Sequence, residues 1–179
     1  MTHRERFPRE HILGVLDVVV GAIEPLIERH AFVGSFRRRM ETCGDADLLV
    51  IPSDDGLGTV LRSLGGRSFV GGSDFIYILI GDTPVNVFVT APVSWGSALQ
   101  YTTGSREHNL AIRSYAKDHD LLANQFGVFR RAGPRTAGPK IAGSSETESG
   151  FYGALGLRWV RPENRCKSPR GNGVIPLTR

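Results

Sequence analysis

The sequence of 179 residues is long enough for one compact domain or for two small lobes that share a core. Its apolar fraction of 40% and its charged fraction of 22% are ordinary for a soluble globular protein, and no apolar run approaches the roughly 20 residues that span a bilayer. The charged start, MTHRERFPRE, does not have the pattern of a signal peptide, so we expect a cytoplasmic protein without membrane contact. Two cysteines are too few for a disulfide framework or a zinc site.

Charge is distributed unevenly along the chain. Residues 1–105 contain 9 Lys and Arg against 12 Asp and Glu, whereas residues 106–179 contain 13 against 6. An acidic half that can hold cations, joined to a basic half that can hold a phosphate backbone, suits a protein that acts on nucleic acid. A merely basic, flexible tail gives the same asymmetry, so charge alone does not decide.

The first elements expected are a helix and two strands. Pro8 suits a first helical turn, and apolar residues recur every three to four positions as far as about Glu28, which predicts an amphipathic helix packed on a sheet. Ala31–Val33 is then a short buried strand that leads into a Gly-Ser turn. Ala46–Ile51 is a second buried strand, which ends at Pro52.

The next segment alternates between turn residues and apolar runs. Asp54 or Asp55 is expected to cap a short helix, and the Gly65-Gly66 pair is expected to end it. Three further strands follow in the prediction: Ser68–Val70, Phe75–Ile80 and Val85–Val89.

Residues 34–47, GSFRRRMETCGDAD, carry the strongest functional pattern of the chain. Residues two apart in a strand point to the same side, so Asp45 and Asp47 are predicted to project their carboxylates together. Neighbouring carboxylates repel each other, and a hard divalent cation relieves the repulsion. Mg²⁺ in particular prefers one or two carboxylates together with the oxygens of a substrate phosphate.

The same stretch has groups that suit an anion. The Gly34-Ser35 turn offers backbone N–H groups and a hydroxyl, and three consecutive arginines, residues 37–39, offer forked donors to phosphate. Alone, an Asp-x-Asp pair is more often a solvated turn, and an arginine triplet is more often an exposed face. Their combination within one short stretch favours a metal–triphosphate site.

This stretch resembles the palm of the nucleotidyltransferase superfamily, and GSFRR…E…GD.D is similar to the family X DNA polymerases in particular. The resemblance implies an α+β fold: a palm, residues 1–93, with a mixed β-sheet and helices on one face, a small α/β thumb, residues 94–166, and a flexible tail, residues 167–179. It also implies two Mg²⁺ (or Mn²⁺) ions held by Asp45 and Asp47. The residues expected to bind the triphosphate are Gly34, Ser35, Arg38 and Gly44.

Asn86 departs from this family pattern. The resemblance places a third metal-binding aspartate on the strand Val85–Val89, and position 86 fits it. An amide oxygen can coordinate Mg²⁺, but it brings no negative charge and cannot accept a proton from an attacking 3′-hydroxyl. We therefore expect weak catalysis, either in a degenerate natural polymerase or in a variant disabled by design.

From Trp95 the pattern is helical, and residues 98–105, ALQYTTGS, are similar to the family X segment that supports the incoming nucleotide. The resemblance places Tyr101 against the ribose, with Thr102 and Gly104 beside the sugar and base. Thr102 stands where the family often has Phe, which predicts weaker base stacking or sugar selection. A plain helix C-terminus, with Gly104 as its stop, is the simpler interpretation of the same residues and is compatible with this role.

A helix capped by Ser105 is predicted over Arg106–Lys117. At 3.6 residues per turn, Arg106, Asn109, Arg113 and Lys117 fall on one side of this helix. Such a polar stripe is either a binding surface or a plain solvated face. The resemblance implies that Asn109 contacts the incoming base. It also implies that the basic residues of the stripe contact the DNA: Arg106, Arg113 and Lys117.

The last third of the chain is expected to complete the thumb. Leu121–Arg130 is a predicted strand or hairpin, residues 131–149 a long loop, and residues 154–157 a capped short helix before a proline-containing exit. The sequence fits a palm and a thumb only, as in the small viral members of the family, so a viral or phage origin is a hypothesis. Association with a nucleoid is a second hypothesis on its location.

The leading hypothesis is a monomeric DNA polymerase that uses deoxynucleoside triphosphates to extend a primer on primer-template or gapped DNA, as in repair. Asn86 is expected to impair it. Two alternatives remain: a catalytically inactive remnant that binds nucleotide or DNA, and a small nucleotidyltransferase of the toxin–antitoxin type, which modifies protein or RNA.

Overall fold

The computed structural model describes residues 5–65, 70–71, 74–134 and 136–165. The chain divides into two compact units, Met1–Ala91 and Pro92–Arg179. Both units contain helices and strands, which confirms the predicted α+β class. Among the described residues there is no helix with the length and apolar character that crossing a membrane requires. The predicted tail, residues 167–179, lies outside the described residues.

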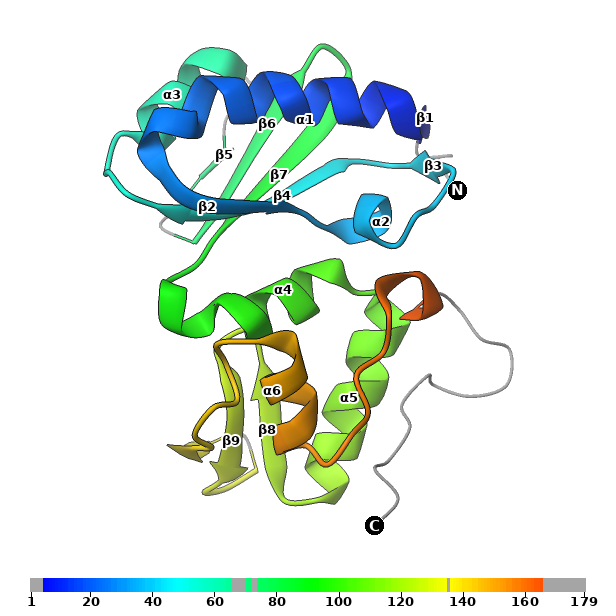
Figure 1. The fold of residues 1–179 in the computed structure, drawn as a ribbon, viewed down its shortest axis with the longest axis vertical. Coiled ribbons are helices and arrows are strands. Elements are labelled where there is room, and N and C mark those ends of the chain that lie inside the picture. The colour runs from blue at the N-terminus through cyan, green and yellow to red at the C-terminus, as the bar shows by residue number, and fades with distance from the viewer. Residues whose placement is uncertain (1–4, 66–69, 72–73, 135, 166–179) are drawn as a thin grey trace. The chain divides into compact units, whose positions relative to one another are not determined.

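The N-terminal unit is built on a five-stranded mixed sheet with the strand order β2-β4-β7-β6-β5 (Figure 1). Strands β4 and β7 pair in parallel, and the other neighbours pair antiparallel. The strands are β2 (Ile27–Phe32), β4 (Ala46–Pro52), β5 (Val70–Gly71), β6 (Phe75–Ile80) and β7 (Thr83–Val89). Of the predicted strand at 68–70, residues 68 and 69 lie outside the described residues.

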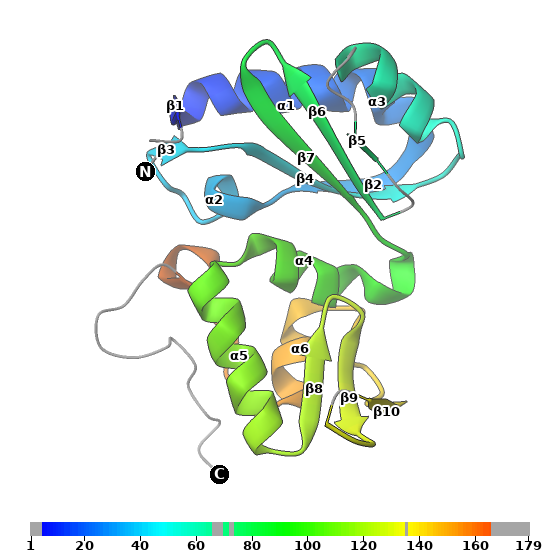
Figure 2. The ribbon, with the colours of Figure 1, turned by 180° about the vertical axis from the view of Figure 1, so that it is seen from behind.

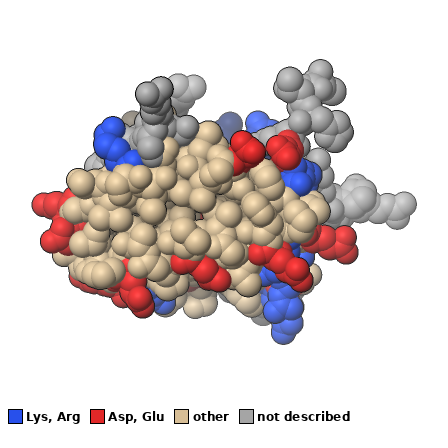
Figure 3. Space-filling model, turned by 90° about the horizontal axis from the view of Figure 1, so that it is seen from above, with Lys and Arg blue, Asp and Glu red and all other residues tan. Residues whose placement is uncertain are grey.

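Two helices, α1 (Arg9–Ile23) and α3 (Leu57–Gly65), cover one face of this sheet (Figure 1). Their apolar sides join the inward side chains of β4, β6 and β7 in a single core, in which Leu16, Leu48 and Val87 are fully buried. The outer surface of the helices is largely uncharged, with acidic side chains along its margins (Figure 3). Strands β4 and β7 thus lie side by side and share this core.

The first helix is shorter than its periodicity predicts. It ends at Ile23, and a 3₁₀ turn, η1 (Glu24–Leu26), follows because Pro25 has no N–H to continue the α-helical ladder. Strand β2 therefore begins at Ile27, four residues before the predicted start at Ala31. Of the two expected cap residues, Asp54 or Asp55, Asp54 instead accepts the N–H of Gly56 in a turn ahead of α3.

Between β2 and β4 the chain forms a compact connection. It contains a single-turn helix, α2 (Gly34–Arg37), and a short strand, β3 (Thr42–Cys43). Strand β3 pairs antiparallel with β1 (Phe7–Pro8), which directly precedes α1. The N-terminus of α1 is thereby attached to the segment that leads into β4.

The C-terminal unit packs three helices with a three-stranded antiparallel sheet, in which β9 lies between β8 and β10 (Figure 2). The helices are α4 (Trp95–Thr103), α5 (Arg106–Asp118) and α6 (Glu148–Ala154), with 3₁₀ turns η3 (Pro92–Ser94) and η4 (Pro162–Arg165). The strands are β8 (Leu121–Asn124), β9 (Gly127–Arg131) and β10 (Ala137–Lys140). Ser105 caps α5 as predicted, through the N–H of His108 at 3.3 Å.

Two predictions for this unit are wrong. Residues 131–149 are not one long loop, because β10 pairs with β9 despite its glycine and proline. The helix predicted at 154–157 lies earlier, at α6, where Thr147 accepts the N–H of Gly150 as the N-cap. A buried ion pair at 2.9 Å between Arg165 and Glu148 then ties η4 to the first turn of α6.

Candidate active site

Three polar side chains converge at one edge of the N-terminal sheet. Asp45 precedes β4, Asp47 is its second residue, and the parallel register places Asp47 opposite Asn86 of β7. The Asn86 amide nitrogen lies 2.8 Å from Asp47 Oδ1 and 3.4 Å from Asp45 Oδ2. All three residues are partly buried. The structure thus brings together the two aspartates that strand alternation predicts on one side and the asparagine that the family resemblance places beside them.

The orientation of the Asn86 amide follows from these contacts. Ionised carboxylates only accept hydrogen bonds, so the NH₂ group, and not the carbonyl oxygen, faces the aspartates. The amide nitrogen therefore lies within hydrogen-bonding distance of both carboxylates that would hold a cation. Coordination of a metal by the Asn86 oxygen requires the amide to turn over and to give up both hydrogen bonds.

The donor set fits a hard divalent cation in part. Asp45 and Asp47 supply two carboxylates, which suits Mg²⁺ completed by water and phosphate oxygens. Asn86 supplies no charge. Consistent with this, the described part of the chain contains no group of three or more His, Cys, Asp or Glu side chains placed to hold a metal ion.

The Gly-Ser turn packs directly against the carboxylate of Asp47. Gly34 has a φ of +59°, and a Cβ at this position would lie 1.8 Å from Asp47 Oδ2, so only glycine fits here. The neighbouring backbone is fixed by the N–H of Val33, which donates to the Asp47 carbonyl at 2.9 Å. The turn and the carboxylate pair therefore form one structural unit.

The hydroxyl of Ser35 is the group in this turn that is best placed to bind a ligand. Its Oγ atom is buried and has no hydrogen-bond partner among the described residues. Such an atom costs free energy unless a ligand or water satisfies it. Arg38, at the end of α2, and Gly44, next to the carboxylates, are partly buried, whereas Arg39 is exposed.

The predicted nucleoside residues lie in the C-terminal unit, where α4 ends. Tyr101 and Thr102 are partly buried in its last turn, and Gly104, with a φ of +69°, ends the helix. The Thr102 hydroxyl donates to the Ala98 carbonyl at 2.7 Å, which is a contact inside the helix. Thr102 therefore presents mainly its methyl group to a ligand.

Asn109 connects α5 to the end of α4. Its NH₂ group donates to the Tyr101 carbonyl at 2.7 Å, and its oxygen accepts from Gln100 Nε2 at 3.0 Å. Sequence reasoning missed Gln100, which is buried and orients the amide. No sequence signal singled it out, because Ser97 and Thr103 are also buried polar residues of α4.

The basic residues expected to contact DNA lie along α5. Arg106, Arg113 and Lys117 are exposed, and Arg113 Nε donates back to the Asn109 carbonyl at 3.3 Å. The predicted site residues thus form two groups, one in each unit. The N-terminal group joins carboxylates to a Gly-Ser turn, and the C-terminal group joins an aromatic helix end to a basic helix.

Residues 98–166 match the protein family described as DNA polymerase beta thumb. The matched segment begins within α4 and includes every predicted nucleoside and DNA residue of the C-terminal unit. The carboxylate pair and the Gly-Ser turn lie before the matched residues.

Proposed function

We propose that the chain is a family X polymerase-like protein, which the match of residues 98–166 to the DNA polymerase beta thumb supports, and that it binds DNA and adds deoxynucleotides to a primer 3′-end at a rate limited by Asn86. The observation that carries the proposal is the convergence of Asp45, Asp47 and Asn86 beside the Gly34-Ser35 turn. A thumb-like unit and a two-carboxylate site in one chain suit phosphoryl transfer to a nucleic-acid end.

In this proposal the α2 turn holds the triphosphate. The buried Ser35 hydroxyl donates to a phosphate oxygen and so gains the partner that it lacks in the protein. Arg38 adds a planar, charged donor at the end of the same turn, and Gly44 leaves room for backbone approach on the other side. Each of these groups binds the part of the nucleotide that leaves as pyrophosphate.

Asp45 and Asp47 are the residues that would hold Mg²⁺ or Mn²⁺ in this site. Divalent cations supply charge neutralisation and alignment of the phosphates in such reactions. The family resemblance implies two ions, and Asn86, beside the carboxylate pair, would offer such an ion a neutral amide oxygen in place of a third carboxylate. With two carboxylates instead of three, the site should support nucleotide binding better than catalysis.

Asn86 also removes a proton acceptor from the reaction. A carboxylate at this position could take the proton of the primer hydroxyl, but an amide has no basic lone pair at neutral pH. Loss of a general base typically slows a reaction by about 10²–10⁴-fold. We propose a slow polymerase whose nucleotide site is nevertheless intact.

The C-terminal unit supplies contacts to the nucleoside and the DNA. In this proposal Tyr101 contacts the sugar and Asn109 contacts the base. The hydrogen bond from Gln100 to the Asn109 oxygen supports the second role, because it fixes the orientation of the amide. The methyl group of Thr102 offers less stacking surface than an aromatic ring. Exposed basic residues on α5 hold phosphates of the duplex, so DNA binding should weaken steeply with salt.

A second candidate is a protein that binds nucleotide or DNA without chemistry. Both hydrogen bonds from Asn86 favour it, because they supply donors to the carboxylate pair in place of a metal ion. A toxin–antitoxin type nucleotidyltransferase has less support, since it has no need of a thumb that holds DNA.

Primer extension separates these functions. The unmodified chain and Asn86→Asp are each incubated with a gapped DNA, deoxynucleoside triphosphates and Mg²⁺ or Mn²⁺. The proposal expects slow extension by the unmodified chain and extension about 100-fold faster or more by Asn86→Asp. Extension by neither protein supports the non-catalytic candidate. Labelling of protein or RNA, with DNA primers left unlabelled, supports the toxin–antitoxin type.

A further inference from the structure

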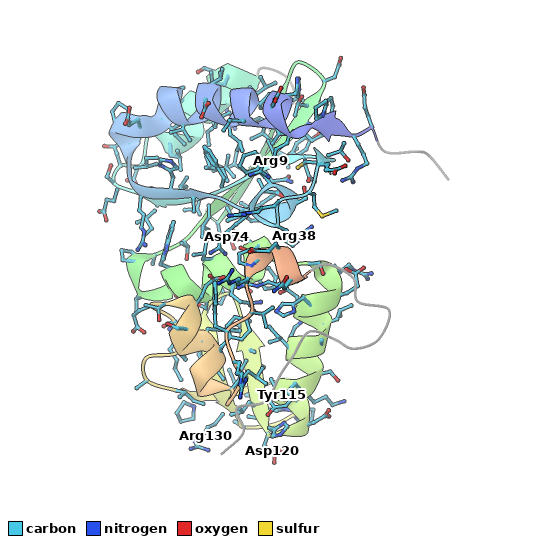
Figure 4. The ribbon with its side chains drawn as sticks, turned by 45° about the vertical axis from the view of Figure 1, so that its right-hand side comes forward. Arg9, Arg38, Asp74, Tyr115, Asp120 and Arg130 are labelled. Carbon is cyan, nitrogen blue, oxygen red and sulfur yellow. The ribbon has the colours of Figure 1, made fainter. Side chains whose placement is uncertain are left out.

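Arg9, the first residue of α1, reaches across to the Gly-Ser turn. Its guanidinium Nη1 donates to the backbone carbonyl of Phe36, and its Cζ lies 3.7 Å from the centroid of the Phe36 ring. Its backbone N–H donates to the Glu41 carbonyl at 3.1 Å. One residue therefore contacts both α2 and the segment that leads to the carboxylates; Figure 4 labels Arg9 together with Arg38.

Phe36, the partner of Arg9, is held in place by the core. It lies between Ser35 and Arg37 in the turn, its side chain is only 8% exposed, and it belongs to the core of the N-terminal unit. Its ring packs edge-on against Phe32 at 5.6 Å between centroids. Its carbonyl also accepts the N–H of Arg39 at 3.0 Å. The Phe36 carbonyl thus joins Arg9 to the end of α2.

We propose that Arg9 is a positioning residue for the triphosphate: it holds the α2 turn and residues 38–44 in the conformation that presents Ser35 and Arg38 to the phosphates. The inference rests on the proposed function and names a further residue for it. A turn that is ordered before binding loses less conformational entropy when the ligand arrives. Removal of Arg9 should weaken nucleotide binding although Arg9 itself is not a phosphate ligand.

The contact needs the chemistry of arginine. A planar guanidinium can stack on the Phe36 ring and donate within its own plane to the adjacent carbonyl, whereas a lysine ammonium is a compact point charge on a flexible stem. Arg9→Lys therefore keeps the charge and removes the stacked, planar donor. If Arg9 acted only through its positive charge, Arg9→Lys would bind nucleotide as the unmodified chain does.

The test is isothermal titration of the full chain with a deoxynucleoside triphosphate analogue that cannot be cleaved between the α- and β-phosphates, in Mn²⁺. The titrated proteins are the unmodified chain, Arg9→Met, Arg9→Lys and Arg62→Met. Arg62 is an exposed arginine on α3 and serves as the matched control for loss of one charge from the same unit.

A positioning role predicts a dissociation constant about tenfold higher for Arg9→Met, which corresponds to 1.4 kcal/mol, with unchanged stoichiometry. Arg9→Lys should show most of this loss, and Arg62→Met should stay within about twofold of the unmodified chain by the usual smallness of surface effects. A merely structural role lowers the folded fraction, and therefore the stoichiometry, while the dissociation constant stays the same.

Three results overturn the inference. The first is an Arg9→Met dissociation constant within twofold of the unmodified chain. The second is full rescue by Arg9→Lys. In both cases the proposed function survives, because the unmodified chain still binds the nucleotide. The third is failure of the unmodified chain to bind the analogue at all, which overturns the proposed function together with the role of Arg9.

Discussion

Replacement of Asn86 by aspartate tests the interpretation of the carboxylate pair through stability. In the unmodified protein the amide donates to Asp47 at 2.8 Å and to Asp45 at 3.4 Å. Asn86→Asp removes these hydrogen bonds and places a third carboxylate at the same distance. A hydrogen bond to a charged group contributes about 1.5–3 kcal/mol. Repulsion between unit charges 4 Å apart is about 4 kcal/mol at an effective dielectric constant of 20, and relaxation toward solvent reduces it.

Together these terms predict that Asn86→Asp destabilises the metal-free N-terminal unit by about 2 kcal/mol or more. For a unit of this size, about 1 kcal/mol corresponds to a shift of roughly 4–8 °C in Tm. Excess Mg²⁺ or Mn²⁺ should reverse the loss, because a ligand that binds only the folded state stabilises it by an amount that grows with the logarithm of its concentration over its dissociation constant. The same ions should raise the Tm of the unmodified chain much less.

Differential scanning calorimetry in EDTA and in Mn²⁺ measures both effects, with Asn86→Ala as the control that removes the amide without adding a charge. Asn86→Ala should lose stability in EDTA and regain less of it in Mn²⁺ than Asn86→Asp does. The reasoning is refuted if Asn86→Asp in EDTA is as stable as the unmodified chain, or if Mn²⁺ raises the Tm of both proteins equally.

Three further substitutions address other parts of the account. Gly34→Ala should abolish binding of the nucleotide analogue in calorimetry, because a Cβ there would lie 1.8 Å from Asp47 Oδ2; unchanged binding would contradict the packing described. Glu148→Ala leaves the guanidinium of Arg165 buried without its carboxylate and should destabilise the C-terminal unit by about 3–5 kcal/mol, which thermal unfolding followed by circular dichroism can measure. Arg113→Ala should weaken DNA binding for all sequences and reduce the slope of log affinity against log salt by about 1, and an unchanged slope would remove this residue from the DNA contacts.

The carboxylate site was predictable because its geometry is local. Asp45 and Asp47 share a side through the period of two along a strand, and the same alternation separates Asn86 from the buried residues of β7. The parallel pairing that brings β7 to β4 is not a local property, and only the family resemblance predicted that Asn86 belongs to this site. The helix after Ser105 was predictable for the same local reason, a cap followed by a regular period.

Errors arose where one residue overrides a periodic pattern or where tertiary contacts override composition. Pro25 ends α1 although the apolar spacing continues, and the residues from Ile27 on form β2 instead. Strand β10 forms in a stretch rich in glycine and proline because β9 offers it an open edge. Arg9 has no pattern of its own in the sequence, since its partner, Phe36, lies 27 residues away and is reached only through the fold.

The central claim, that the Asp45–Asp47 pair binds a divalent cation that grips the phosphates of a nucleotide, is tested most directly by nucleotide binding with and without metal. The uncleavable deoxynucleoside triphosphate analogue is titrated into the unmodified chain and into Asp47→Asn, each in Mn²⁺ and in EDTA. The account predicts that binding by the unmodified chain depends on Mn²⁺ and that Asp47→Asn loses this dependence together with most of its affinity. Equal affinity of the unmodified chain in Mn²⁺ and in EDTA would contradict it.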